Sequence, residues 1–304
     1  MSASVKDFGN DIGFWTVDIK KEFRKQFRPR PRASHKGDYG RIFILAGSRG
    51  LSGACYLASM AAFRSGAGLV TVGVPESLVP PLTKRLTEAM MKPLPETRQG
   101  TLSRSALQPI RNFLKTQDIL AIGPGLSLNR QTQAVVRDTV LGSTKPVVLD
   151  ADGLNAFKGQ ADLFRKCKVP VIVTPHAGEF VRLFGTPVPK GEKLRRQRAV
   201  DVAKKYRVIV VLKGYHTVVA SPQGKVYVNK TGNPGMATGG SGDILTGMIA
   251  AMLGQGAAPF QAACFGVLIH GLAGDMAAKQ KGEISMVASD ILGALPSAFQ
   301  QMIG

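Results

Sequence analysis

The chain repeatedly places a short, uninterrupted apolar run directly before a polar or glycine-rich loop. These runs lack the alternation typical of a strand with one solvated face, so each predicts a strand covered on both faces. Segments of helical character separate them, and this order of elements produces a parallel sheet between layers of helices. We therefore expect an α/β fold with three layers, α/β/α, and a mostly parallel central sheet. The predicted strands cover residues 41–46, 69–74, 119–122, 147–150, 171–174 and 208–212, with a hairpin of residues 217–220 and 225–228.

The N-terminal part of the chain differs from the rest. Residues 1–33 are polar and charged, with Phe14, Trp15, Phe23 and Phe27 interspersed, and alternating arginine and proline at 28–32 favours extended backbone. We interpret residues 1–33 as a basic arm whose apolar residues dock on the body or on a partner subunit. Nothing after residue 40 resembles a linker, and 44% of the 304 residues are hydrophobic. Residues 34–304 are therefore expected to form one domain.

The net charge of +20 attracts anions of many kinds, including nucleotides and nucleic acid. Much of it lies in two clusters, at residues 20–41 and 190–207. We favour a solvated basic surface, since no nucleic-acid-binding motif is recognisable and no nucleic-acid partner is expected. A nucleic-acid-binding protein that uses the basic arm is the alternative from another class.

Cysteine usage and hydropathy bear on the compartment. Cys55, Cys167 and Cys264 lie far apart and show neither a disulfide framework nor metal-ligand spacing. The first thirty residues contain no continuous apolar core of the kind found in a secretory signal, and the longest apolar stretch is interrupted around residues 254–259. We expect a protein of the reducing cytoplasm with no membrane partner.

The segment 233–243, NPGMATGGSGD, combines an anion cradle with a carboxylate. Its glycines let the backbone turn tightly, and consecutive N–H groups in such a turn form a nest for phosphate oxygens. The apolar run that follows predicts a buried helix whose N-terminus faces the same loop. Asp243 would then orient or deprotonate an attacking hydroxyl in phosphoryl transfer, or it is an ordinary helix N-cap. No lysine follows the last glycine, so the loop is not a Walker A motif.

Polar loops follow most of the predicted strands, and ligands bind at the carboxyl ends of strands in open α/β sheets. These loops cover residues 47–54, 123–126, 150–155, 174–179 and 213–217, so we expect one shared cleft. Asp150 and Asp152 would hold Mg²⁺ through water, with Glu179 as a further carboxylate near the metal. His176 would donate to or accept from a substrate group, and Lys213 supplies a point charge for a phosphate.

Each of these residues also has a structural alternative. Asp152 would cap the helical segment that begins at Gly153, and Glu179 would be a favourable charge in the first turn of a helix. His176 would make a hydrogen bond within the fold. The sequence alone leaves these pairs of interpretations open.

Taken together, the loops resemble one family. Its motifs stand here in order as KGDYG at 36–40, GAGLV at 66–70, GPGL at 123–126, LDADGLN at 149–155, TPHAGE at 174–179, KG at 213–214 and the segment 233–243. The chain is identified from them, over about residues 35–300, as a member of the ADP/ATP-dependent NAD(P)H-hydrate dehydratases of the ribokinase-like superfamily. The resemblance implies a ribokinase-like fold and a repair reaction on the S epimer of hydrated NADH and NADPH (NAD(P)HX). ADP or ATP would phosphorylate the ring hydroxyl, and elimination of phosphate would restore NAD(P)H.

The resemblance also implies site residues. Asp243 would be the catalytic base, and Mg²⁺ would bridge the phosphates of the adenine nucleotide. The substrate contacts would be Ala54, Gly125, His176 and Asp243. The nucleotide contacts would be Lys213, Gly214, Tyr215, His216, Thr217, Asn233, Pro234, Gly235, Met236, Ala237, Thr238, Gly239, Gly240, Ser241 and Gly242.

The family pattern further implies a homotetramer, and many members carry an N-terminal epimerase domain. In its place this sequence has the basic arm, so we expect a separate NAD(P)HX epimerase in the same pathway. Ala177 stands where proline is common and Thr246 where alanine is common. The runner-up function is a ribokinase-like kinase of a small vitamin-precursor alcohol, which would release a stable phosphorylated product. The choice between ADP and ATP, and between NADHX and NADPHX, is not readable from the residues.

Overall fold

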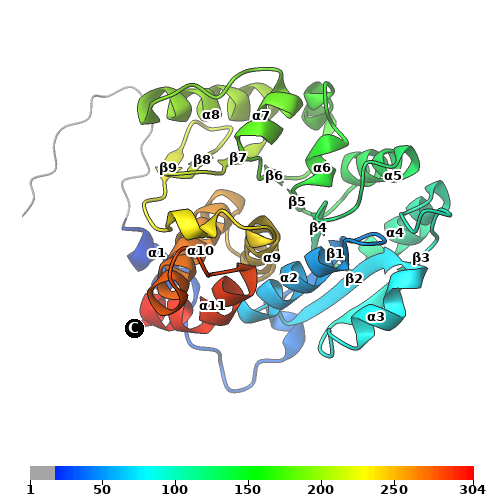
Figure 1. The fold of residues 1–304 in the computed structure, drawn as a ribbon, viewed down its shortest axis with the longest axis horizontal. Helices are drawn as coiled ribbons and strands as arrows, with labels where there is room; N and C mark the ends of the chain where they lie inside the picture. The colour runs from blue at the N-terminus through cyan, green and yellow to red at the C-terminus, as the bar shows by residue number, and fades with distance from the viewer. Residues whose placement is uncertain (1–17) are drawn as a thin grey trace, which may run out of the picture.

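The computed structural model describes residues 18–304, and its centre is one mixed sheet of nine strands in the order β3-β2-β1-β4-β5-β6-β7-β8-β9 (Figure 1). All neighbours from β3 to β7 pair in parallel, whereas β8 and β9 are added antiparallel. The predicted mostly parallel sheet is therefore confirmed. The strands are β1 (Arg41–Leu45), β2 (Leu69–Pro75), β3 (Met90–Leu94), β4 (Ile119–Ile122), β5 (Val147–Leu149), β6 (Val171–Val173), β7 (Ile209–Leu212), β8 (Val218–Ala220) and β9 (Val226–Val228).

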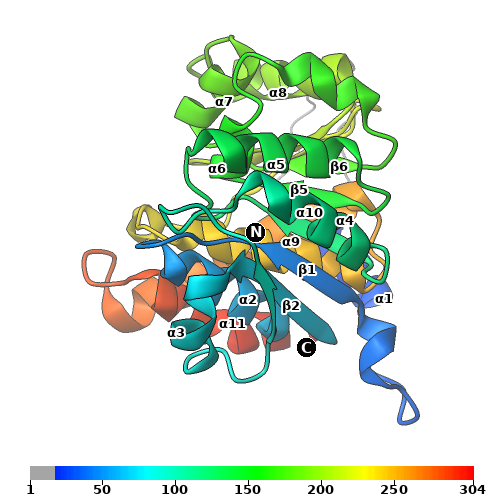
Figure 2. The ribbon, with the colours of Figure 1, turned by 90° about the vertical axis from the view of Figure 1, so that its right-hand side faces the viewer.

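Helices cover both faces of this sheet, which completes the expected three layers (Figures 1 and 2). One face carries α2 (Ser52–Arg64), α9 (Ser241–Gly254), α10 (Pro259–Lys281) and α11 (Ala288–Ile303), with α1 (Ile19–Gln26) packed on their outer side. The other face carries α4 (Leu107–Leu114), α5 (Arg130–Leu141), α6 (Asp152–Asn155), α7 (Ala177–Phe184) and α8 (Glu192–Tyr206). The short helix α3 (Val79–Thr83) follows β2.

Strand β1 shows why a continuous apolar run suits this architecture. Ile42 and Ile44 belong to the core under α2 and α9, while Phe43 and Leu45 belong to the core under α4 and α5. All four side chains are fully buried. A polar residue at any of these positions would lose its water without gaining a partner, so apolar residues are required on both faces.

Strand β3 is absent from the prediction. It carries Lys92 and Pro93 on the edge of the sheet, and all its residues except Leu94 are exposed or half-exposed. Proline cannot donate to a ladder and is confined to edges, and a charge blunts an edge against further pairing. The lysine and the proline that obscure this strand in the sequence are therefore residues that suit an edge strand.

Part of the basic arm lies within the described residues. Helix α1 begins after Asp18, which accepts hydrogen bonds from the N–H groups of Lys20 and Lys21 at 3.0 and 3.2 Å. Its Phe23 is fully buried and meets Phe265 of α10 edge to face, with ring centroids 5.4 Å apart. Phe14 and Trp15 lie outside the described residues. The boundary at residue 33 remains a prediction.

Helix α10 is long and apolar enough to cross a membrane by length and composition alone. In the fold, 78% of its most apolar window is buried inside the protein. It therefore serves as a core helix, packed against α9 and α11.

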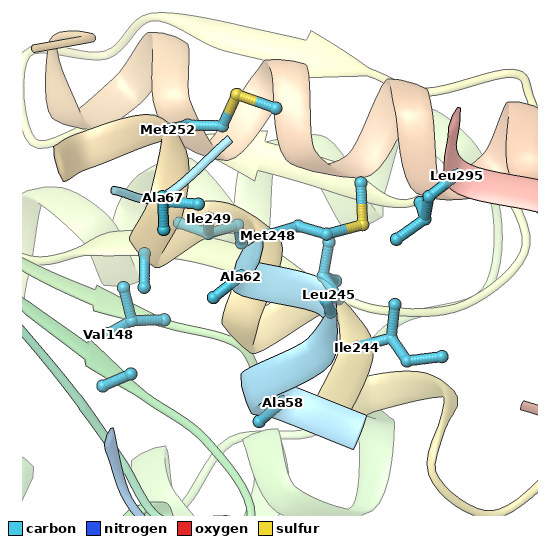
Figure 3. Packing of buried hydrophobic residues seen from close by; sticks show 14 of the residues in the cluster. Ala58, Ala62, Ala67, Val148, Ile244, Leu245, Met248, Ile249, Met252 and Leu295 are labelled. Carbon is cyan, nitrogen blue, oxygen red and sulfur yellow. The ribbon is translucent and has the colours of Figure 1, made fainter. Parts of the chain in front are cut away.

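Helices α2 and α9 approach each other unusually closely (Figure 3). Ala58 and Ala62 of α2 lie in the same buried cluster as Ile244 and Met248 of α9. At Gly247 of α9, an added Cβ would lie only 2.0 Å from the carbonyl oxygen of Ala58. Glycine and alanine at this contact bring the N-terminus of α9 to the edge of the sheet, where the polar loops gather.

Gly247→Ala should therefore destabilise the protein. The new methyl group has no space, and overpacking of this kind costs about 1–3 kcal/mol. The free energy of unfolding, measured by urea denaturation, should fall by that amount. Gly293→Ala in α11 is the matched control, since its Cβ meets nothing within 4 Å, and alanine there should stabilise by a few tenths to about 1 kcal/mol. Equal effects of the two substitutions would contradict close packing of α2 on α9.

Candidate active site

The polar loops that follow β1, β4, β5, β6 and β7 meet at the carboxyl edge of the sheet. Gly47 donates its N–H to the carbonyl of Pro124 at 2.8 Å, and Lys213 donates its N–H to the carbonyl of Pro175 at 2.9 Å. A Cβ on Gly123 would lie 1.8 Å from the carbonyl oxygen of Asp150. The predicted gathering of these loops is thus observed in their contacts.

A buried ion pair lies at the centre of this edge. The Lys213 ammonium at the end of β7 is 2.8 Å from Oδ1 of Asp150 at the end of β5, and 3.7 Å from Oε2 of Glu179. Asp150 is 1% exposed, and its Oδ2 accepts a hydrogen bond from the hydroxyl of Thr246 in α9 at 2.9 Å. Burial lowers the pKa of Lys213, but the two carboxylates outweigh burial and raise it overall, so the lysine stays charged.

The glycine-rich segment lies over this ion pair. Helix α9 begins after Gly240, whose φ of 92° is readily adopted only by glycine. A Cβ on Gly242 would lie 3.2 Å from the Lys213 ammonium and 3.4 Å from Oδ2 of Asp150, whereas a Cβ on Gly239 would meet nothing within 4 Å. The loop therefore touches the ion pair at one glycine and is open at another.

Asp243 lies in the first turn of α9 and is not its N-cap, which is Gly240. Among residues 18–304, no group donates a hydrogen bond to its carboxylate. Burial, together with the charge of Asp150, raises its pKa from 3.8 to about 7, against a smaller opposite effect of Lys213. A half-buried carboxylate with this pKa is poised to exchange a proton at neutral pH.

His176 and Glu179 form a reciprocal cap on α7. Nδ1 of His176 accepts the N–H groups of Gly178 and Glu179 at 3.0 and 3.3 Å, and Oε2 of Glu179 accepts the N–H of His176 at 2.8 Å. Both structural alternatives for these residues are therefore present in the fold. Because Nδ1 accepts, Nε2 is the ring nitrogen that can donate, and it lies 3.6 Å from Oε1 of Glu179. The substrate contact itself stays a prediction.

The expectation that Asp152 caps the helix at Gly153 is wrong. Helix α6 includes Asp152, and its N-cap is Ala151, with φ of 47°. The Asp152 carboxylate accepts the N–H of Ser127 at 2.8 Å and the side-chain amide of Asn155 at 3.2 Å. Its visible role is to fix the loop that follows β4, which carries Gly125.

The three predicted metal-associated carboxylates do not form a ready-made metal site. Across residues 18–304, no group of three or more His, Cys, Asp or Glu side chains is placed to hold a metal ion. However, Asp150, Asp152 and Glu179 all act on Asp243, against the single ammonium of Lys213. This excess of negative charge beside the glycine-rich loop would suit Mg²⁺ that arrives with phosphate oxygens and is held through water.

The remaining predicted contacts lie around the same edge. A Cβ on Gly125 would lie 3.1 Å from the Cβ of Ala54, which places these two predicted substrate contacts side by side. The Tyr215 ring is 84% exposed and stacks on His216 with centroids 3.9 Å apart. His216 is in turn held by Glu192, whose Oε2 lies 2.9 Å from Nδ1.

Two residues of the site were missed from the sequence. Thr246 was noted only as a departure from a pattern, yet its hydroxyl holds Asp150. Asp275, inside the apolar helix α10, accepts hydrogen bonds from Gly232 and Asn233. A charge or hydroxyl in an otherwise apolar helix was the available signal, but its partner is distant in sequence.

The doubly covered sheet, with a glycine-rich loop that leads into α9 and a carboxylate in the first turn, defines a ribokinase-like enzyme. A family model described as NAD(P)H-hydrate dehydratase matches residues 42–297. The chain belongs to the NAD(P)H-hydrate dehydratase family.

Individual relatives agree. The ADP-dependent (S)-NAD(P)H-hydrate dehydratase of Bacillus subtilis is 35% identical over 96% of this chain and 99% of its own length. The bifunctional NAD(P)H-hydrate repair enzyme of Moorella thermoacetica is 45% identical over 92% of this chain, which spans 53% of that protein. The crystal structure of the Bacillus subtilis ADP/ATP-dependent enzyme, co-crystallised with ATP and Mg²⁺, superposes with a TM-score of 0.82 at 34% identity, covering 97% of this chain and 100% of that one.

The raised pKa of Asp243 predicts how stability depends on pH. The folded protein keeps a proton on Asp243 between pH 3.8 and about 7, where the unfolded chain has lost it. Stability from this group is therefore lost as pH rises through that window. Asp243→Asn should be more stable than the wild type at pH 8, by up to about 4 kcal/mol, and the difference should shrink toward pH 4.

The measurement is urea unfolding at several pH values without nucleotide or Mg²⁺. Asp201→Asn, at an exposed aspartate of α8, is the control and should show no such trend. A difference between wild type and Asp243→Asn that stays constant with pH would contradict the raised pKa.

Proposed function

We propose that this chain uses ADP or ATP to dehydrate the S epimer of NAD(P)HX and thereby regenerates NADH and NADPH. The observation that carries the proposal is the position of Asp243. Its carboxylate lies in the first turn of α9, beside the open glycine loop and next to the Lys213–Asp150 ion pair. A base and a phosphate cradle at one place are what transfer of a phosphoryl group to a hydroxyl requires.

The chemistry proceeds in two steps. The Asp243 carboxylate takes the proton of the ring hydroxyl while the hydroxyl oxygen attacks the terminal phosphoryl group of the nucleotide. The P–O bond that joins this phosphoryl group to the rest of the nucleotide then breaks. The phosphorylated oxygen then leaves as phosphate with the C–O electron pair, and loss of a proton from the neighbouring ring carbon restores the double bond. Phosphate is a far better leaving group than hydroxide, which is why a nucleotide is consumed to remove water.

The residues around Asp243 divide the remaining tasks. The glycine loop and the N-terminus of α9 stabilise the negative charge of the transferring group. Lys213 is held charged by Asp150 and Glu179, so it adds a fixed positive potential beneath the phosphates. Asp150, Asp152 and Glu179 would hold Mg²⁺ through water, and that ion would supply charge neutralisation for the phosphates of the nucleotide.

The substrate and nucleotide are assigned to opposite sides of Asp243. We assign NAD(P)HX to Ala54, Gly125 and His176, because Nε2 of His176 is free of the capping bonds that occupy Nδ1. We assign the adenine nucleotide to residues 213–217 and 233–242. The exposed Tyr215 ring, stacked on His216, offers the adenine a flat surface.

Three wider features belong to the same proposal. The R epimer of the hydrate has to be converted to the S epimer first, and we expect a separate NAD(P)HX epimerase in the same pathway to do so. A homotetramer is expected, with apolar contacts from the region after residue 258, and the exposed Ile284 and Val287 there suit such a contact. The site of action is the cytoplasm, where NADH and NADPH turn over.

Asp243→Asn should abolish most turnover. The amide keeps the shape of the side chain but cannot accept the hydroxyl proton, and loss of a positioned base costs about 10²–10⁴-fold in rate. The assay mixes the protein with hydrated NADH, Mg²⁺ and either ADP or ATP, and follows the return of the dihydronicotinamide absorbance. The Asp243→Asn protein should still bind ADP and should still unfold cooperatively. Asp201→Asn is the control, and its turnover should equal that of the wild type.

The outcomes separate the candidate functions. Unchanged turnover in Asp243→Asn would rule out the assigned role of the base. A wild-type protein that binds ADP yet restores no absorbance with either nucleotide would favour the small-molecule kinase, whose phosphorylated product accumulates.

Tyr215→Ala should weaken ADP binding by about 3–10-fold, which is the range that an aromatic stacking contact provides. Since Tyr215 lies away from Asp243 in this assignment, kcat at saturating nucleotide should change little. Calorimetric titration with ADP measures the effect, and Tyr215→Phe, which keeps the ring, should bind like the wild type. Equal affinity in Tyr215→Ala would refute the stacking surface.

A further inference from the structure

Helix α10 runs behind the segment that connects β9 to α9 and makes direct contacts along it (Figure 1). The side-chain amide of Asn229 donates to the carbonyl of Val267 at 3.0 Å. The hydroxyl of Thr231 donates to the carbonyl of Leu268, also at 3.0 Å. The beginning of the nucleotide loop is therefore attached to the backbone of α10.

Two glycines of α10 make this close approach feasible. A Cβ on Gly271 would lie 2.1 Å from Oγ1 of Thr231, and a Cβ on Gly274 would lie 2.2 Å from Sδ of Met236. Real Cβ atoms do not come this close to other heavy atoms, so larger residues would push the loop off the helix. Positions 271, 274 and 275 lie on one face of α10 by helical spacing.

Asp275 on that face holds the loop with both carboxylate oxygens. Oδ2 accepts the N–H of Gly232, and Oδ1 accepts the side-chain amide of Asn233, each at 3.0 Å. The Oδ1 of Asn233 then accepts the N–H of Gly235 at 3.0 Å, at the short 3₁₀ turn η5 (Pro234–Met236). One carboxylate on α10 thus fixes the orientation of the asparagine that opens the loop.

The far end of the loop is held by the same helix. Nε2 of His270 lies 3.3 Å from the hydroxyl of Ser241, the first residue of α9. Burial lowers the pKa of His270 to about 4, so the ring is neutral at pH 7. Residues 233–240, which are assigned to the nucleotide, are therefore held at both ends by α10, through Asp275 and His270.

We propose that Asp275 is a positioning residue that sets the affinity for the adenine nucleotide by holding Gly232 and Asn233 in their bound arrangement. The inference rests on the proposed function, since it assumes that residues 233–242 bind the nucleotide. A loop held in advance avoids the entropy cost of ordering when the ligand binds. Asp275 does not contact the reacting groups in this arrangement and takes no part in the chemical step.

Electrostatics alone predicts the opposite effect of removing Asp275. A carboxylate close to a phosphate-binding loop repels phosphate, so its removal would strengthen nucleotide binding if charge were all that mattered. Loss of the two hydrogen bonds would weaken binding. The sign of the change in ADP affinity therefore shows whether Asp275 holds the loop in place or acts only through its charge.

The test compares Asp275→Ala and Asp275→Asn with the wild type and with Asp201→Ala. Asp201 is a suitable control because it is exposed in α8 and also accepts a side-chain hydrogen bond, from Gln197 at 2.7 Å. Calorimetric titration with ADP, without hydrated substrate, gives Kd. We expect about a tenfold increase in Kd for Asp275→Ala, as for the loss of two hydrogen bonds, and a smaller increase for Asp275→Asn, which retains one acceptor.

Steady-state assays with hydrated NADH supply the second measurement. The KM for ADP should rise with Kd, while kcat at saturating ADP should stay within about twofold of wild type, as for a lost binding interaction. Unchanged or tighter ADP binding in Asp275→Ala, or a fall in kcat without a change in Kd, overturns the inference. Should Asp275→Ala fail to fold, Asp275→Asn decides by the same criteria. A folded wild type that binds no ADP overturns the proposed function, and the inference falls with it.

Discussion

The ion pair between Lys213 and Asp150 is the interaction on which the rest of the site depends. It joins the ends of β5 and β7, which are separated in the sheet by β6, at 2.8 Å in a nearly dry environment. Thr246 of α9 and Glu179 of α7 bring helices from opposite faces of the sheet to the same two groups. Removal of Lys213 would leave Asp150 as a buried charge without its cation, at a cost of about 3–5 kcal/mol. The ion pair thus connects the helical layers on both faces of the sheet.

The same ion pair also affects the carboxylate that we propose as the base. Burial, together with the charge of the neighbouring Asp150, opposes ionisation of Asp243 and raises its pKa to about 7. A carboxylate in water would be a weak base at neutral pH, whereas this one is near half-protonated there. The folded protein gives up stability at neutral pH for that property, as expected where a functional group is held in an unfavourable environment.

Sequence patterns predicted the layers of this protein because burial on both faces leaves a direct trace in residues such as Ile42 and Phe43. They located the edge of the sheet where the polar loops meet, because glycine loops such as 239–242 leave their own trace in the sequence. They failed where a residue contacts a partner that is distant in the sequence. The expected contact of Lys213 with a phosphate stays a prediction, but its ion pair with Asp150 was not foreseen. The roles of Thr246 and Asp275 likewise depend on contacts that only the fold brings together. The edge strand β3 was hidden by its proline and lysine.

The start of α9 shows how a local choice of residue produces function. An aspartate at the N-cap would accept a backbone N–H, which stabilises the ionised form and lowers the pKa. Here glycine occupies that position at Gly240, and an N-cap glycine costs only a few tenths of a kcal/mol relative to aspartate. The carboxylate is moved three residues into the helix, where no described group donates a hydrogen bond to it. The loop keeps its tight turn, and the carboxylate oxygens of Asp243 are left free to take up the proton that the proposed function requires.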